Sequence, residues 1–96
     1  MRSIIDGADC CYLCGRNGSG DPLEVHHILG GPNRRLSDED GLVVKLCGER
    51  CHRNGKNAVH RNRETDLLLK QTAQKVWEET YGTREEFRAR YGKSYL

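Results

Sequence analysis

The chain has 96 residues and a formal net charge of +2, with 35% hydrophobic and 31% charged residues. A chain of this length forms one small domain, whose thin core is usually reinforced by a metal or another staple. No apolar run approaches the ~20 residues that cross a membrane, and the N-terminal stretch MRSIIDGADCC lacks the apolar segment of a signal peptide. We therefore expect a cytoplasmic protein whose five cysteines bind metal or remain free thiols rather than forming disulfides.

In chain order, the first expected feature is a metal-binding knuckle, CYLC, at residues 11–14, followed by a loop rich in Gly, Asn and Ser. The stretch LEVHHIL, residues 23–29, predicts a strand, and the β-branched stretch LVVKL, residues 42–46, predicts a second strand. Between them, GGPNRR is typical of a turn. Ser37 and Asp40 then have the spacing of a weak helix start.

The rest of the chain is predicted to be helical. Apolar residues recur at helical spacing between residues 65 and 81, and Gly82 is a natural end for that helix. Thr83 and Glu86 have the spacing of a capping box, which predicts a second, shorter helix.

Four of the five cysteines have the spacing of a zinc site. A CxxC pair and a CxxxC pair are separated by a segment of hairpin length: Cys11, Cys14, Cys47 and Cys51. Each pair can offer two thiolates to one tetrahedral Zn²⁺ ion, whose binding would stabilise the fold. Three alternatives stay open: Cys10 takes the place of Cys11, His52 takes the place of Cys51, or the cysteines are free buried thiols.

Together these features predict an α+β fold, namely a small zinc-stabilised β-hairpin plus helix with a C-terminal helical extension. We expect a single domain over residues 1–96. Within it, residues 11–63 form the metal-binding core and residues 64–96 form the helical support.

The four histidines lie in the predicted hairpin and in the segment after it: His26, His27, His52 and His60. Neighbouring residues of a strand point to opposite faces. His26 can therefore join His52 or His60 on a divalent metal ion, while its neighbour stays off the metal and takes a proton from water. A metal ion, a base and a basic surface are together sufficient to cleave a phosphodiester bond.

Charged residues surround the same segment. Five basic residues lie between residues 47 and 63, where Glu49 is the only acid, and such a cluster is either a phosphate-facing surface or a solvated polar one. The candidates to contact backbone phosphates are Arg34, Arg35, Arg53 and Arg61. Glu24 shares a strand face with His26 and is a candidate partner for a ligating imidazole. The acidic run at residues 38–40 is expected to be solvated.

Two stretches, LEVHHILGG and GLVVKLCGERCH, resemble the motif of the HNH endonucleases, which have the ββα-metal or His-metal-finger fold. The resemblance covers about residues 11–60, and the C-terminal stretch is similar to the end of small HNH-like proteins of phages and prophages. It implies that His26 is a metal ligand, that His27 is the general base, and that His52, the final histidine of the motif, is a second metal ligand.

The resemblance also places His60 on the metal if the long helix begins later than usual, which Gly55 allows. The sequence departs from the family pattern at two points. Asp40 and Gly41 stand where the middle asparagine normally precedes the second strand. In the family this asparagine ties the loop that orients the base, a role that another backbone or side-chain group could take. The CxxxC pair also has one residue more than the usual CxxC pair, which can shift the histidine that follows it.

The implied function is that of a metal-dependent DNA endonuclease of phage origin. Its partner is DNA, its catalytic ion is Mg²⁺, Mn²⁺, Ni²⁺ or Zn²⁺, a separate Zn²⁺ ion is structural, and it does not associate with a membrane. One alternative is a non-catalytic, zinc-stabilised DNA-binding module that assists phage packaging or recombination, and another is a zinc-stapled protein-interaction domain. The adjacent histidines favour the enzyme, because a pure binding module needs no base beside a metal ligand.

Overall fold

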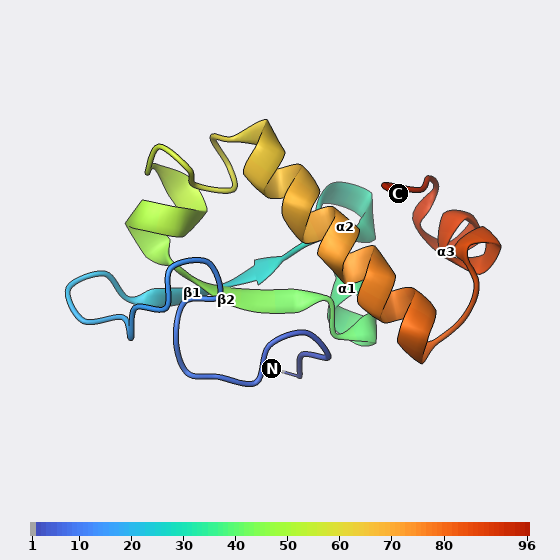
Figure 1. The fold of residues 1–96 in the computed structure, drawn as a ribbon, viewed down its shortest axis with the longest axis horizontal. Helices are drawn as coiled ribbons and strands as arrows, with labels where there is room; N and C mark the ends of the chain where they lie inside the picture. Colours follow the sequence, from blue (N-terminus) through green and yellow to red (C-terminus); the bar gives the residue numbers. More distant parts are fainter. Residues whose placement is uncertain (1) are drawn as a thin grey trace.

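The computed structural model describes residues 2–96 and has the predicted α+β composition, with a two-stranded antiparallel hairpin and helices (Figure 1). In chain order the elements are β1 (Leu23–His27), the 3₁₀ turn η1 (Gly31–Asn33), α1 (Arg34–Asp40), β2 (Val43–Cys47), the π-helical turn η2 (Gly48–Arg53), α2 (Arg63–Thr80) and α3 (Arg84–Tyr91). The long axis of the molecule is 41 Å and the short axis is 19 Å. Among the described residues, no helix combines the length and the apolar character needed to cross a membrane.

The hairpin pairs β1 with β2 so that His26 lies opposite Val44 and His27 lies opposite Val43. β1 begins at Leu23 as predicted but ends two residues early, at His27, and β2 is shifted by one residue, to Val43–Cys47. The N-terminal segment covers the outer edge of β2, where the Tyr12 amide donates to the Lys45 carbonyl at 2.8 Å. This contact brings the first cysteine pair beside the end of β2.

The connection between the strands is a turn followed by a short helix, which agrees with the weak helix-start signal in this segment, but the predicted start at Ser37 was wrong. α1 begins three residues earlier, directly after the 3₁₀ turn that contains Pro32. Ser37 is fully buried and does not cap a helix. Its hydroxyl donates to the Leu42 carbonyl at 2.7 Å and accepts from the Leu29 amide at 3.3 Å. The serine therefore joins α1 to the ends of both strands.

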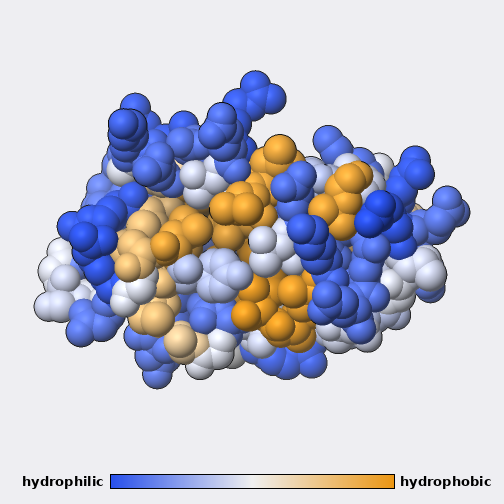
Figure 2. Space-filling model, viewed as in Figure 1, coloured by the Kyte–Doolittle hydropathy of each residue, from blue (hydrophilic) through white to orange (hydrophobic). Residues whose placement is uncertain are grey.

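The core forms where the hairpin meets α2 and α3. Leu69, Ala73 and Trp77 are buried on the predicted face of α2, which Asn62 caps by accepting from two amides of the first turn. The predicted capping box at the start of α3 is confirmed, and this helix buries Phe87 against the Trp77 ring at 5.4 Å between centroids. The solvent side of α2 is not uniformly hydrophilic. Figure 2 shows an apolar area among otherwise hydrophilic side chains on the face where α2 lies in front.

The expectation that the acidic run at residues 38–40 is solvated holds for Asp38 and Glu39, which are exposed, but it is wrong for Asp40, which lies where α1 meets the two C-terminal helices. Its carboxylate accepts from Trp77 Nε1 at 2.8 Å, from the Tyr91 hydroxyl at 2.6 Å and from Arg90 Nε at 2.7 Å. Burial raises the pKa of Asp40, but the hydrogen bonds from Arg90, Tyr91 and Trp77 outweigh it and hold the pKa below its usual value. Asp40 therefore fastens the helical extension to the hairpin connection.

We expect Asp40→Ala to lower the free energy of unfolding by about 2–4 kcal/mol, because three donors in or beside the core lose their acceptor. Urea denaturation at pH 7 measures this change. Glu39→Ala is the matched control, since the Glu39 carboxylate is half exposed and its contact with Arg90, at 3.3 Å, is longer than that of Asp40. Equal stability of the two variants would contradict the role of Asp40.

The same contact predicts a pH dependence of stability. Because the pKa of Asp40 is lower in the folded than in the unfolded chain, its contribution is fully present above the unfolded value of about 3.9. It is lost as the pH falls through the lower pKa of the folded state. The stability difference between wild type and Asp40→Ala should therefore narrow in acid, as measured by urea denaturation between neutral pH and about pH 3.

Candidate functional site

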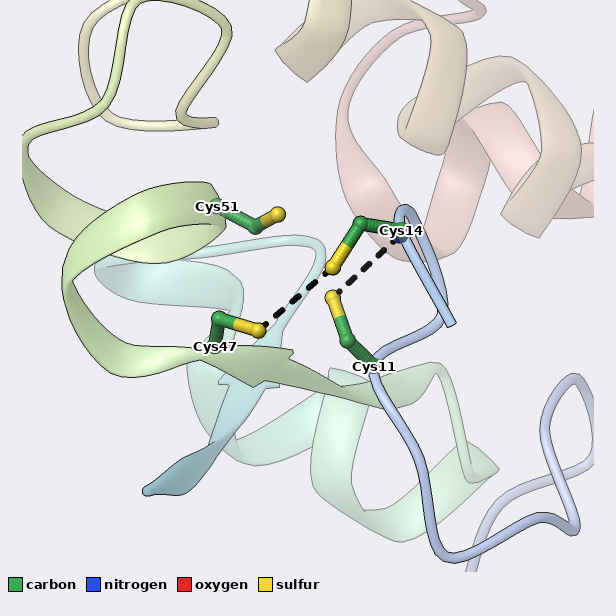
Figure 3. A group of neighbouring side chains, drawn as sticks. All are labelled: Cys11, Cys14, Cys47 and Cys51. Carbon is green, nitrogen blue, oxygen red and sulfur yellow. Dashed lines mark hydrogen bonds between the residues drawn. The ribbon is translucent and has the colours of Figure 1, made fainter. Parts of the chain in front are cut away.

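Four cysteines converge where the N-terminal segment meets the end of the hairpin (Figure 3). Cys11 and Cys14 face Cys47, the last residue of β2, and Cys51 of η2, and one sulfur from each lies within 4.8 Å of the others. Sγ of Cys14 and Sγ of Cys47 are 3.5 Å apart. Cys10 lies outside this group, so of the alternatives left by the sequence the set of four cysteines is the one that the fold assembles. Four sulfurs in this arrangement could hold a zinc ion.

Two local backbone features shape the cysteine cluster. Gly15 follows the CxxC pair with a φ of 79°, a conformation that glycine adopts readily, and its amide closes the knuckle on the Cys11 carbonyl at 2.8 Å. The CxxxC pair spans the start of η2, whose π-type winding accommodates more residues in a turn than an α-helix does. The extra residue of the CxxxC pair is thus absorbed by the helix geometry.

The four thiols differ in their electrostatic surroundings. Burial raises the pKa of Cys47 to about 11. Burial also acts to raise the pKa of Cys14, but hydrogen bonds from the Arg16 backbone and side chain outweigh it and lower this pKa to about 6. A zinc ion would favour the thiolate form of the whole set, since metal binding displaces thiol protons. The donor chemistry and the spacing therefore fit a structural zinc.

Three of the four histidines form a second cluster. The ring centroids of His26 and His52 are 5.1 Å apart, and those of His26 and His60 are 5.3 Å apart. One nitrogen from each ring lies within 4.8 Å of the others, so the three imidazoles could hold a metal ion. His26 is buried, and its Nε2 has no hydrogen-bond partner among residues 2–96. A buried nitrogen of this kind is costly unless something binds it, and a metal ion would fill this role.

The chemistry of these imidazoles also suits a metal. Burial and, to a smaller extent, the neighbouring imidazoles lower the pKa of His26 to about 3, so this ring is neutral at physiological pH. Burial likewise lowers the pKa of His60. Neutral imidazole is the form that binds metal ions.

Glu24 orients one of the three rings. Its Oε1 lies 2.8 Å from His52 Nδ1, as expected for a partner of a ligating imidazole, and its other oxygen accepts from Arg53. With Nδ1 donating to the carboxylate, Nε2 of the same ring remains available to a metal ion. A carboxylate behind a ligating histidine fixes the ring and makes it a better ligand.

The third ring reaches the cluster because the long helix begins late. α2 starts at Arg63, and His60 lies in the loop before it. The His60 amide donates to the His52 carbonyl at 3.1 Å, which holds this loop against η2. Gly55 makes the approach possible, since a Cβ atom there would lie 1.9 Å from the Arg50 carbonyl oxygen. The role of Gly55 inferred from the sequence therefore has a steric basis.

His27, the fourth histidine, lies outside the cluster of the other three. His27 Nε2 lies 3.1 Å from Asp38 Oδ1, and the His27 side chain is 17% exposed. Asp38 belongs to α1, so the connection between the strands supplies a carboxylate beside this histidine. This contact was not predicted, because the acidic run was taken to be solvated.

All four histidines line one cleft of about 540 Å³. Arg34, Asp66, Lys70 and Tyr95 line the same cleft. Of these, only Arg34 was a candidate from the sequence. Asp66 and Lys70 form an ion pair of 2.8 Å one helical turn apart, a spacing that the sequence displays. The position of Tyr95 depends on contacts between distant segments and had no local signal.

The four candidate arginines have different surroundings. Arg34 lines the histidine cleft, and Arg35 lies in an adjoining hollow beside His27 with 84% of its side chain exposed. Arg61 donates to the Asn54 carbonyl at 3.2 Å and also lines a smaller hollow. Arg53 donates to the carboxylates of Glu24 and Glu49. Its charge is therefore not free, and it helps to hold the Glu24 carboxylate that contacts His52.

No protein-family model matches the chain, and no curated protein or solved structure is similar to it at a significant level. What bears on function is therefore the pair of metal-ligand clusters. The turn η2 contributes one residue to each cluster, Cys51 to the cysteines and His52 to the histidines. The histidine cluster lies in a cleft that basic side chains also line.

The cysteine cluster predicts that the protein contains a tightly bound zinc ion. Cys47→Ser should remove it and lower the melting temperature, whereas Cys10→Ser should leave both unchanged, because Cys10 lies outside the cluster. Elemental analysis by mass spectrometry and thermal unfolding measure the two effects. Loss of zinc from neither variant, or from both, would contradict the assignment.

The contact between Glu24 and His52 predicts a second effect on metal binding. Glu24→Gln should weaken Ni²⁺ binding at the histidine cluster by about tenfold, because the ring loses its charged partner. Isothermal titration of the zinc-loaded protein with Ni²⁺ measures this affinity. Glu49→Gln is the matched control, since Glu49 also binds Arg53 but touches no histidine. An equal change in both variants would show that the effect passes through Arg53 alone.

Proposed function

We propose that this protein is a metal-dependent endonuclease of the HNH type, which hydrolyses phosphodiester bonds of DNA. The observation that carries the proposal is the division among the four histidines. Three imidazoles lie close enough to share a metal ion, while His27 lies in the same cleft, outside that group and against the Asp38 carboxylate. A metal site with a separate base in one cleft can supply both the charge stabilisation and the proton acceptor that metal-assisted phosphodiester hydrolysis uses.

The chain's own residues have distinct roles in this reaction. With Nε2 of His27 donating to Asp38, Nδ1 is free to accept the proton of an attacking water. The water oxygen bonds to phosphorus as the bond from phosphorus to the leaving oxygen breaks, and the leaving oxygen takes a proton from solvent. A divalent ion held by the three histidines would stabilise the charge that develops on the phosphate and the leaving oxygen.

Basic residues at the cleft support a polyanionic substrate. Arg34 and Lys70 line the cleft itself, and Arg35 lies beside it. Contacts of this kind with phosphates position a nucleic acid without reading its sequence. The proposed zinc site has a structural role, because Cys51 and His52 are neighbours on η2, so that fixing the cysteine also fixes the histidine.

We expect the zinc-loaded protein to nick supercoiled plasmid in the presence of a divalent ion such as Mg²⁺, Mn²⁺ or Ni²⁺, and not in EDTA. His27→Ala should lower the rate at least about 100-fold without loss of metal binding, since the base is removed. His52→Ala should lose both metal and activity. Asp9→Asn is the control, because Asp9 is exposed and lies on the N-terminal segment, paired with Lys45. Circular dichroism checks that each variant is folded.

Two outcomes would contradict the proposal. Nicking that survives in folded His27→Ala would exclude this histidine as the base. Binding of the plasmid without nicking by any metal-loaded form would favour the non-catalytic DNA-binding module, which the same zinc site and basic side chains would serve.

A further inference from the structure

The end of the chain is held firmly against the middle of α2. The Tyr95 amide donates to Gln74 Oε1 at 2.7 Å, and Gln71 Nε2 donates to the Tyr95 carbonyl at 3.0 Å. Gln74 is fully buried and also donates to the Ser94 hydroxyl at 2.9 Å. Figure 1 shows the C-terminus beside α2. Because chain ends are usually poorly ordered unless they are tied down, these amide contacts give Tyr95 a defined place.

That place is the wall of the histidine cleft, where Tyr95 is flanked by two cations. The ammonium groups of Lys70 and Lys93 lie 5.4 Å and 5.0 Å from the centre of its ring. Lys70 is also paired with Asp66. Lys93 is exposed and takes part in no ion pair among residues 2–96, so its ammonium group can leave the ring without breaking one.

We infer that Tyr95 is a stacking platform for an unpaired base and that the preferred substrate of the cleft is single-stranded or locally unpaired DNA. An aromatic face bordered by basic groups is the combination with which proteins bind single strands, since the cations attract the backbone and the ring stacks on the base. Bases inside a duplex present only their edges, so a ring can meet the face of a base only when the base has left the stack.

The size of the cleft agrees with this inference. Its volume of about 540 Å³ lies within the range of pockets that enclose small ligands, which a nucleotide fills and a duplex does not enter. As the base stacks, the Lys93 ammonium moves from the ring to a neighbouring phosphate. The inference rests on the proposed function, because it assigns a substrate form to the same cleft.

The competing role for Tyr95 is packing alone, since part of its side chain lies against the core. Two substitutions separate the roles. Tyr95→Leu keeps an apolar side chain and the backbone contacts to the two glutamines, but it removes the ring. Tyr95→Phe keeps the ring, and the Tyr95 hydroxyl makes no hydrogen bond within residues 2–96. Tyr81→Leu is the matched control, because Tyr81 is exposed after the end of α2 and does not line the cleft.

The test is equilibrium binding of a fluorescein-labelled 12-mer, single-stranded or annealed to its complement, to zinc-loaded protein that carries His27→Ala to prevent cleavage. We expect tighter binding of the single strand, a loss of roughly tenfold in Tyr95→Leu for the single strand alone, and no change in Tyr95→Phe or Tyr81→Leu. Equal losses on both oligonucleotides, or no loss in folded Tyr95→Leu, would overturn the inference.

This experiment is independent of nuclease activity. Plasmid nicking together with a Tyr95→Leu variant that binds like the parent would retain the proposed function and reject the stacking platform. A single-strand-specific loss in Tyr95→Leu together with a wild type that never nicks would retain the platform and reject the enzyme.

Discussion

The arrangement of the site depends on the meeting of two distant segments at four cysteine side chains. The N-terminal segment supplies Cys11 and Cys14, and the end of the hairpin supplies Cys47 and Cys51. Without a cation between them, four sulfurs this close would repel one another as thiolates, so the cluster is stable only with protons or a metal. His52 is the neighbour of Cys51 on η2, and the His60 amide donates to the His52 carbonyl, so both histidines take their positions from this junction.

A second constraint is the short helix inserted between the strands. Three of its residues contact three different parts of the molecule. Ser37 binds the ends of both strands, Asp38 contacts His27, and Asp40 accepts hydrogen bonds from α2 and α3. A seven-residue helix of this kind has little stability by itself, so its packing and these polar contacts must hold it in place. The candidate base is therefore positioned by the same element that fastens the helical extension.

Much of the fold and part of the site could be predicted from residues that act through local spacing. The cysteine pairs, the adjacent histidines of β1 and the capping box at Thr83 each depend on short-range geometry, and the structure brings them together as expected. The acidic run and Arg53 could not be predicted in this way, because the partners of Asp40 and of Arg53 are brought in by tertiary packing. The position of Tyr95 depends on two glutamines that lie more than 20 residues earlier, and nothing in the local sequence indicates that contact.

The adjacency of Cys51 and His52 couples the two metal-ligand clusters thermodynamically. One peptide unit carries a ligand of each cluster, so an ion that orders η2 through the thiolates lowers the entropic cost of arranging the imidazoles, and the reverse holds by the same amount. Loading of the two sites should therefore be cooperative. In a chain that receives only one ion, the second site will be both less occupied and less well formed, so the protein will tend to exist either with both sites filled or with neither.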